Sequence, residues 1–91
     1  MLIALIAKDK PGAAQLRADN RPDHLEYLKA HADQVSQAGP LLSEDGGMIG
    51  SLIILDVADM AAAEGWAADD PYAKAGLFAS VELIEWKRVI G

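Results

Sequence analysis

The chain has 91 residues, no cysteine and a formal net charge of −6 at pH 7. Its length fits one domain, 1–91, and the lack of cysteine excludes disulfides, thiolate nucleophiles and cysteine-based metal sites. With 52% hydrophobic and 24% charged residues, the composition is that of a globular protein. An acidic chain without a basic stripe does not suit the phosphate backbone, so no nucleic-acid partner is expected.

The N-terminal segment Leu2–Ala7 is continuously apolar and is closed by Pro11-Gly12. These features predict a β-strand that is covered on both faces. The run is far shorter than the roughly 20 residues that a membrane-spanning helix needs, and it lacks the basic start and cleavage site of a signal peptide. We therefore expect a cytoplasmic protein with no membrane partner. The polar residues 9–21 are expected to form a loop or lid.

A first helix is predicted to begin at Arg21-Pro22-Asp23 and to end before Gly39-Pro40. Proline suits the first helical position and an acidic residue suits the first turn, whereas glycine followed by proline ends a helix. Apolar side chains recur within this segment at helical spacing, which predicts one face that packs on the rest of the domain. These side chains are Leu25, Leu28, Ala32 and Val35.

The second half of the chain carries clear signals for its strands and helices. Aspartate favours the position before a helix, and an Asp-Pro pair places proline at the first helical position. Asp59 and Asp70-Pro71 therefore each predict a helix start. In chain order, the expected elements are strand Leu41–Ser43, strand Leu52–Leu55, helix Met60–Ala68, helical turn Tyr72–Ala75 and strand Leu77–Val89.

The complete order of elements is βαββαβ with a small inserted turn. This order predicts an α+β, ferredoxin-like fold, in which a four-stranded antiparallel sheet carries its helices on one face. The two fully apolar strands also need cover on their second face. Another copy of the same sheet, related by a two-fold axis, provides that cover most simply. We therefore expect a homodimer that packs through the open sheet face.

Two histidines, His24 and His31, are the side chains best suited to proton transfer near neutral pH. On one helix they would lie about 10 Å apart along its axis, which is too far to bind one metal ion. No other metal-binding motif occurs, so no metal ion is expected. His24 would lie in the first turn of its helix, where the positive end of the helix dipole favours the neutral ring that accepts a proton.

Each candidate residue also has a purely structural interpretation. A histidine in a first helical turn is often a surface or packing residue. Asp70 can serve as a helix cap alone, and Asp69 is an equally well placed carboxylate. Arg21 either binds an anionic group or is solvated, Ser51 either orients a ligand or ends a strand, and Tyr72 either closes a pocket or packs.

Trp66 and Trp86 are expected in the core or the dimer interface, and His31 at the surface or the edge of the core.

Four short motifs follow one another along the chain: Arg21-Pro22-x-His24-x-x-x-Leu28, Gly39-Pro40, Gly50-Ser51 and Trp66-Ala67-x-x-Asp70-Pro71-Tyr72-x-x-Ala75-Gly76. In this order and at this spacing they resemble the YciI-like (YCII-related) proteins, nearly from end to end. The resemblance implies a ferredoxin-like dimeric α+β barrel, related to muconolactone-isomerase-like enzymes. It also implies an active site where His24 meets Asp70. Related proteins with the same pair act as dehydrochlorinases in aromatic degradation.

The leading hypothesis is a small-molecule enzyme that moves a proton, as an isomerase or lyase or in dehydrochlorination, without a metal or organic cofactor. His24 would act as general base or acid, and Asp70 would orient it. Arg21, Ser51 and Tyr72 would hold a polar or anionic ligand in a pocket between the helix layer and the sheet edge, near residues 9–21. The alternatives are a non-catalytic metabolite-binding or dimeric interaction module, a purely structural role, and a haem-binding barrel.

Overall fold

The computed structural model describes all 91 residues of the chain. The strands are β1 Leu2–Asp9, β2 Val35–Leu42, β3 Met48–Asp56 and β4 Phe78–Glu85, and the helices are α1 Ala14–Ala30, α2 Met60–Asp69 and α3 Pro71–Lys74, with one 3₁₀ turn at Ala32–Gln34. The four strands form one sheet in the order β2-β3-β1-β4, and neighbouring strands are antiparallel. None of the helices has the length and apolar character that crossing a bilayer requires.

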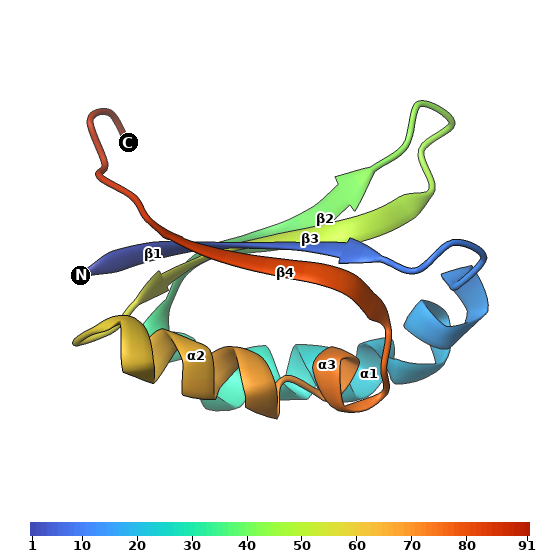
Figure 1. Cartoon of the computed structure of the whole chain (residues 1–91), viewed down its shortest axis with the longest axis horizontal. Helices are drawn as coiled ribbons and strands as arrows, with labels where there is room; N and C mark the ends of the chain where they lie inside the picture. The colour runs from blue at the N-terminus through green and yellow to red at the C-terminus, as the bar shows by residue number, and fades with distance from the viewer.

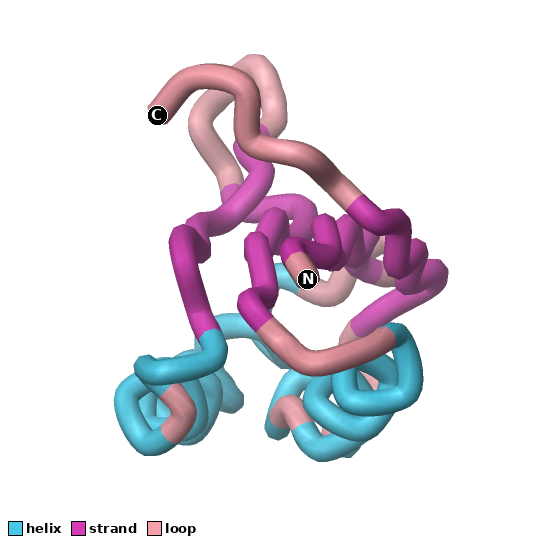
Figure 2. The backbone as a smooth tube through the Cα atoms, turned by 90° about the vertical axis from the view of Figure 1, so that its left-hand side faces the viewer, coloured by secondary structure: helices cyan, strands magenta, loops and turns pink.

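This order of elements and strands is that of a ferredoxin-like fold, as the sequence predicted. The helices lie together on one side of the sheet (Figure 1). Seen at right angles to that view, the helices and the strands form two layers, and the C-terminal segment runs on the side of the sheet away from the helices (Figure 2). The sheet therefore has a helix-covered face and an open face.

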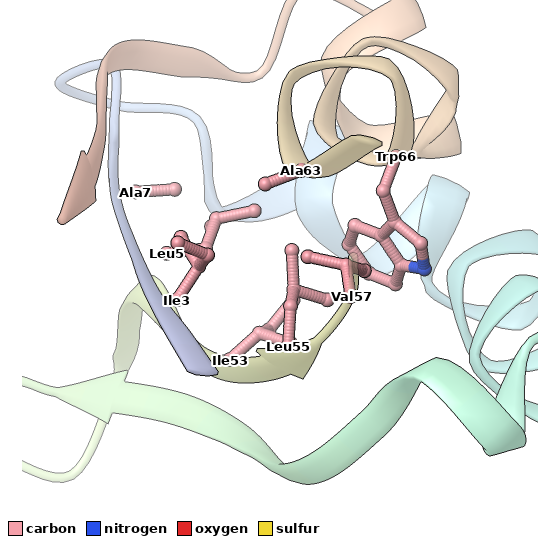
Figure 3. Close-up of a cluster of buried hydrophobic side chains, with 8 residues drawn as sticks. All are labelled: Ile3, Leu5, Ala7, Ile53, Leu55, Val57, Ala63 and Trp66. Atoms are coloured by element: carbon pink, nitrogen blue, oxygen red, sulfur yellow. The ribbon is translucent and has the colours of Figure 1, made fainter. Parts of the chain in front are cut away.

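The hydrophobic core lies on the helix-covered face. Alternate residues of a strand point to the same side, so Ile3 and Leu5 of β1 share this face with Ile53 and Leu55 of β3. Trp66 of α2 packs in the same cluster, which confirms its prediction as a core residue (Figure 3). Full burial of such aliphatic side chains stabilises a fold by roughly 1.5–3 kcal/mol each.

The open face consists of the alternate set of side chains on the same strands. Leu52 of β3 and Ile84 of β4 are 40% and 50% exposed on this face. Ala4, Ile6 and Ile54 lie on the same face and are less exposed than these two residues. Together the side chains form a continuous apolar surface. The members of the open face are Ala4, Ile6, Leu52, Ile54 and Ile84.

The prediction of a loop or lid over residues 9–21 was wrong. β1 continues to Asp9, the chain turns at Pro11-Gly12, and α1 begins at Ala14. Gly12 has a φ of 71°, a conformation that glycine adopts without strain, so the chain reverses within a few residues. Pro22 consequently lies inside α1 rather than at its start. Pro22 has no backbone N–H, so one helical hydrogen bond is missing. Its ring is exposed, and the helix continues past it.

The predicted end of the first helix was also wrong. α1 ends at Ala30, and the segment that contains Gly39-Pro40 is strand β2. Proline is tolerated there because β2 is an edge strand, where an outward-facing position needs no N–H donor. Of the apolar face predicted for this helix, Leu28 packs against the core, but Leu25 is 42% exposed.

The two helix starts in the second half of the chain are as predicted. The side chain of Asp59 accepts a hydrogen bond from the Ala62 backbone N–H at 2.8 Å, at the start of α2. Asp70 accepts one from the Tyr72 backbone N–H at 3.0 Å, at the start of α3. The last strand is shorter than predicted, so Trp86 lies beyond β4, is 37% exposed and does not belong to the core.

Candidate functional site

A pocket of about 120 Å³ lies between α1 and the edge strand β2, with side chains from β3 and α3 completing its wall. It occupies the predicted position between the helix layer and the sheet edge. Its α1 residues recur at helical spacing and therefore share one face of the helix. The lining residues are Arg17, Arg21, His24, Leu25 and Leu28 of α1, Ala38, Gly39 and Pro40 of β2, Ser51 and Ile53 of β3, and Tyr72 of α3.

His24 and Asp70, which the sequence analysis paired, are in contact. His24 Nδ1 lies 2.8 Å from Asp70 Oδ1, and both side chains are buried. The same carboxylate oxygen accepts the Tyr72 backbone N–H, so Asp70 caps α3 and holds the imidazole at once. Asp69, the competing carboxylate, is exposed. The second ring nitrogen of His24, Nε2, makes no hydrogen bond within the chain and is not closed off from the surface.

The local surroundings of His24 differ from the prediction. His24 lies in the middle of α1 rather than in its first turn, because α1 begins at Ala14. The helix-dipole argument therefore does not apply to this residue. Tertiary contacts hold the imidazole instead, since the Tyr72 ring stacks on it at a centroid distance of 4.0 Å and an interplanar angle of 15°.

Two residues of the site, Asp9 and Arg17, were missed in the sequence analysis. Arg17 donates from Nε and Nη2 to the two oxygens of Asp9 at 2.6 and 2.9 Å, and Nη2 also donates to Ser51 Oγ at 2.9 Å. The side chains of this ion pair are only 5% and 6% exposed. Burial opposes the charge of Arg17, but its interactions with Asp9 and Tyr72 together outweigh this effect and hold the pKa of Arg17 above its usual value.

The sequence does carry a signal for Arg17. Arg17, Arg21 and His24 stand at spacings of four and three, which puts them on one face of a helix. That face becomes visible only when residues 14–21 are taken as helical. Asp9 has no comparable signal, because nothing local indicates that the last residue of a strand pairs with an arginine in the next helix.

The other predicted site residues also reach the pocket. Arg21 is an exposed side chain that lines it, whereas Ser51 is buried and bound to Arg17. The Tyr72 ring is buried beside His24, and Arg17 Cζ lies 4.5 Å from its centroid. Burial raises the pKa of Tyr72 above its usual value, and the charges of Arg17 and Arg21 only partly offset this. The hydroxyl therefore keeps its proton at neutral pH.

The second histidine, His31, lies outside the pocket. It is half-buried at the C-terminal end of α1, with Nδ1 3.0 Å from the Tyr27 carbonyl oxygen. This position agrees with its prediction as a surface or edge-of-core residue. The chain contains no group of three or more His, Cys, Asp or Glu side chains that is placed to hold a metal ion.

The fold and the site define a small ferredoxin-like α+β domain with a buried histidine–aspartate contact beside a pocket. The YCII-related domain matches residues 1–87, and the chain belongs to this family. Protein YciI of Escherichia coli is 33% identical over 97 residues, which cover 98% of this chain and 99% of that protein. The family that the sequence motifs indicated is thereby confirmed.

The chain is also similar to proteins of solved structure. A 5-chloro-2-hydroxyhydroquinone dehydrochlorinase from Burkholderia phenoliruptrix, in complex with 2,5-dihydroxybenzoquinone, is 35% identical with a TM-score of 0.88, over 96% of this chain and 94% of that one. An antibiotic biosynthesis monooxygenase matches with a TM-score of 0.55 at 13% identity, over 97% of this chain and 100% of that one. The second likeness shows the shared fold alone.

Proposed function

We propose that the chain is a small-molecule enzyme in which His24 transfers a proton to or from an oxygenated ring compound. The observation that carries this proposal is the 2.8 Å contact between Asp70 Oδ1 and Nδ1 of His24, a residue that lines the pocket. A carboxylate next to Nδ1 favours the tautomer with its hydrogen on Nδ1. Nε2 then carries the lone pair that accepts a proton, and the carboxylate supports the imidazolium that forms.

The size and lining of the pocket support a ligand with a single ring. The pocket volume of about 120 Å³ is comparable with an apolar cavity of about 150 Å³ that holds benzene. Leu25, Leu28 and Ile53 offer apolar contacts, while Arg21 and Ser51 offer hydrogen bonds to a polar or anionic substituent. The similar dehydrochlorinase binds 2,5-dihydroxybenzoquinone, which is also a single oxygenated ring.

Elimination of HCl from a chlorinated, hydroxylated ring is the reaction to test first. A proton from one ring hydroxyl moves to the carbon that bears chlorine, and that oxygen becomes a carbonyl. A second hydroxyl then loses its proton while the C–Cl bond breaks, so the products are a quinone and HCl. No oxidant or reductant is consumed. His24 would carry the proton in each step, and we propose that it does so without a metal or organic cofactor.

The experiment is to measure chloride release and quinone formation from 5-chloro-2-hydroxyhydroquinone. His24→Ala should lower kcat by about 10²–10⁴-fold, the usual contribution of a general acid or base. His31→Ala removes the other histidine, which lies outside the pocket, and should leave kcat unchanged. Treatment of the wild type with a chelator should also leave the rate unchanged.

Two outcomes would contradict this proposal. Unchanged turnover in a folded His24→Ala variant would remove His24 from the mechanism. Binding of ring compounds by the wild type, without any product detectable by mass spectrometry, would instead favour a non-catalytic metabolite-binding module.

The open face supports a further part of the proposal, a homodimer. Leu52 and Ile84 are large apolar side chains exposed on this face, next to Ile6 and Ala4 of the central strand. A continuous apolar surface is typical of a contact site, and a second copy of the same face is the partner that two-fold symmetry supplies.

A further inference from the structure

Tyr72 carries a hydroxyl for which the chain provides no acceptor. The residue is fully buried, its Oη has no hydrogen-bond partner within the chain, and it lines the pocket. Among the neighbouring buried groups, His24 Nδ1 contacts Asp70 Oδ1 and Arg17 binds Ser51, while Asp70 Oδ2 also has no partner within the chain. An unpaired buried donor costs stability, so native proteins usually provide it with a partner. The pocket is the place from which such an acceptor can come.

The Tyr72 ring is held firmly in this position. His24 stacks on it at 4.0 Å, Arg17 Cζ lies 4.5 Å from its centroid, and Phe78 meets it edge-on at 6.0 Å and 78°. The backbone N–H of Tyr72 is bound to the same Asp70 oxygen that contacts His24. Both residues line the pocket, so the phenol ring and the imidazole form one packed unit of its wall.

Arg17 extends this unit to the other end of the site. Its Nε and Nη2 are used by Asp9 and Ser51, which fixes the guanidinium next to the Tyr72 ring. Its Nη1 makes no hydrogen bond within the chain and is not closed off from the surface. A continuous series of contacts therefore runs from Asp9 through Arg17, Tyr72 and His24 to Asp70.

We infer that the Tyr72 hydroxyl donates a hydrogen bond to a ring oxygen substituent of the bound ligand, and that Arg17 is a positioning residue that acts through Tyr72. The ligand class is a single-ring compound with a carbonyl or oxyanion oxygen, because a buried O–H needs an acceptor and the pocket holds about one ring. This inference rests on the proposed function, which places the reacting atoms of the ligand beside His24.

The role follows from the charge that proton transfer creates. When an O–H or C–H bond of the ligand breaks and its proton forms a bond to His24 Nε2, the electron pair left behind moves onto a ligand oxygen. Tyr72 O–H then faces a stronger acceptor than before, so its hydrogen bond tightens in the transition state. The positive charge of Arg17 beside the ring favours the same change. Tyr72 is therefore assigned as a catalytic residue, distinct from its predicted part as a pocket wall.

The test removes the hydroxyl and keeps the ring. Tyr72→Phe should lower kcat for 5-chloro-2-hydroxyhydroquinone by about 10²–10³-fold, the usual effect of losing one oxyanion donor. It should also weaken binding of 2,5-dihydroxybenzoquinone and shift the visible absorption of the bound quinone. Its Tm should not fall, because an unpaired hydroxyl is lost. Tyr27→Phe is the matched control: its hydroxyl already binds the Trp66 carbonyl oxygen, so its Tm should fall while kcat stays unchanged.

Arg17→Lys tests the positioning role, because it keeps the charge but loses the two-pronged contact with Asp9. We expect kcat to fall more than KM rises, with the same direction of absorption shift as in Tyr72→Phe. A merely structural role would lower Tm without moving that absorption. If Tyr72→Phe fails to fold, 3-fluorotyrosine in place of Tyr72 keeps the hydroxyl but makes it more acidic, and the pH profile of kcat should move to lower pH.

The outcomes separate this inference from the proposed function. If Tyr72→Phe binds the quinone and turns over like the wild type while His24→Ala is inactive, the inference is overturned and the proposed function stands. If no protein forms product but Tyr72→Phe still loses quinone affinity, the donor role is supported and the proposed function fails. If the wild type binds neither 2,5-dihydroxybenzoquinone nor benzoate, the ligand class is overturned.

Discussion

The two faces of the sheet are made by the same strands but differ in burial: the helices cover one face, and the other is open. On β3, Leu55 is fully buried under the helices, whereas Leu52, three residues earlier, is 40% exposed on the open face. Both are leucines in one continuous apolar run, Leu52–Leu55. Apolar content alone therefore does not distinguish a side chain that stabilises the monomer from one that is available to a partner. The position of the helices makes that distinction.

The helix-covered face is itself divided along β3. Leu55 lies in the core cluster with Trp66 of α2, while Ser51, on the same side of the strand, lies in the pocket under α1. Ile53 belongs to both regions. One strand face therefore passes from a dry core to a polar site within five residues, Ser51–Leu55, and the two helices of the layer serve different purposes.

The largest expected effect tests the contrast between the faces directly. Leu55→Ala should lower the free energy of unfolding by about 2–5 kcal/mol, because it leaves a cavity under α2. Leu52→Ala, the matched control on the open face, should cost about half of that or less, since its side chain is already partly in water. Urea unfolding at low protein concentration measures both values. Equal losses would show that the open face is not open in solution.

A second test asks whether a copy of the chain covers the open face. Ile84→Asp places a charge on that face, and two-fold symmetry brings a second copy of the charge near it. We expect the dimer to weaken by about tenfold to a hundredfold, which corresponds to about 1.4–3 kcal/mol. Sedimentation equilibrium measures the change.

The control for this test lies on the same strand. Val81 is 42% exposed, close to the 50% of Ile84, but pairs with Ala7 on the other side of the sheet. Val81→Asp should therefore leave self-association unchanged. A wild-type chain that remains monomeric at high concentration would contradict the proposal of a homodimer.

The features predicted well from the sequence are those with local causes. Asp59 and Asp70 were predicted as helix starts because a carboxylate before a helix satisfies free N–H groups within its own turn. The α+β order followed from two apolar strands and these starts. The contact between His24 and Asp70 came instead from the resemblance to a family, since no local pattern joins residues 46 positions apart.

The errors arose where a local signal had two meanings. Pro22 and Gly39-Pro40 are typical of a helix start and a helix end, but proline is also tolerated at exposed helical positions and on edge strands. Which meaning applies depends on the tertiary position of α1 and β2. Arg17 was not predicted as a site residue for the same reason, because a residue assigned to a loop shares no helix face with His24.

A third prediction shows that openness varies within the open face. Gly39 of β2 pairs with Leu52 of the open face, and Gly50 lies two residues before Leu52 on β3, on the same side of that strand. A Cβ at Gly50 would overlap the Ala7 carbonyl oxygen, a backbone atom of the central strand, whereas a Cβ at Gly39 meets nothing within 4 Å. Gly50→Ala should cost about 1–3 kcal/mol of unfolding free energy. Gly39→Ala should be neutral or stabilising by up to about 1 kcal/mol, since it restricts the unfolded chain. Similar Tm values for the two variants would refute this account.

The smallest effect concerns Tyr27 of α1, which packs on Trp66 and against the core of the helix-covered face. Burial, together with the nearby charges of Asp69 and Asp70, raises the pKa of Tyr27 to about 12. In the unfolded chain the pKa is about 10, so the folded state holds this proton more tightly. The stabilisation is fully present below about pH 10 and is lost as the pH rises toward about 12.

Urea unfolding at several pH values over this range checks the sign of that effect. The wild-type unfolding free energy should fall more steeply with pH than that of Tyr27→Phe, which has no phenol to titrate at this position. Tyr72 titrates in both proteins, so the difference between the two slopes isolates Tyr27. Parallel slopes would mean that the Tyr27 hydroxyl is not desolvated, and that the helix-covered face admits water beside Trp66.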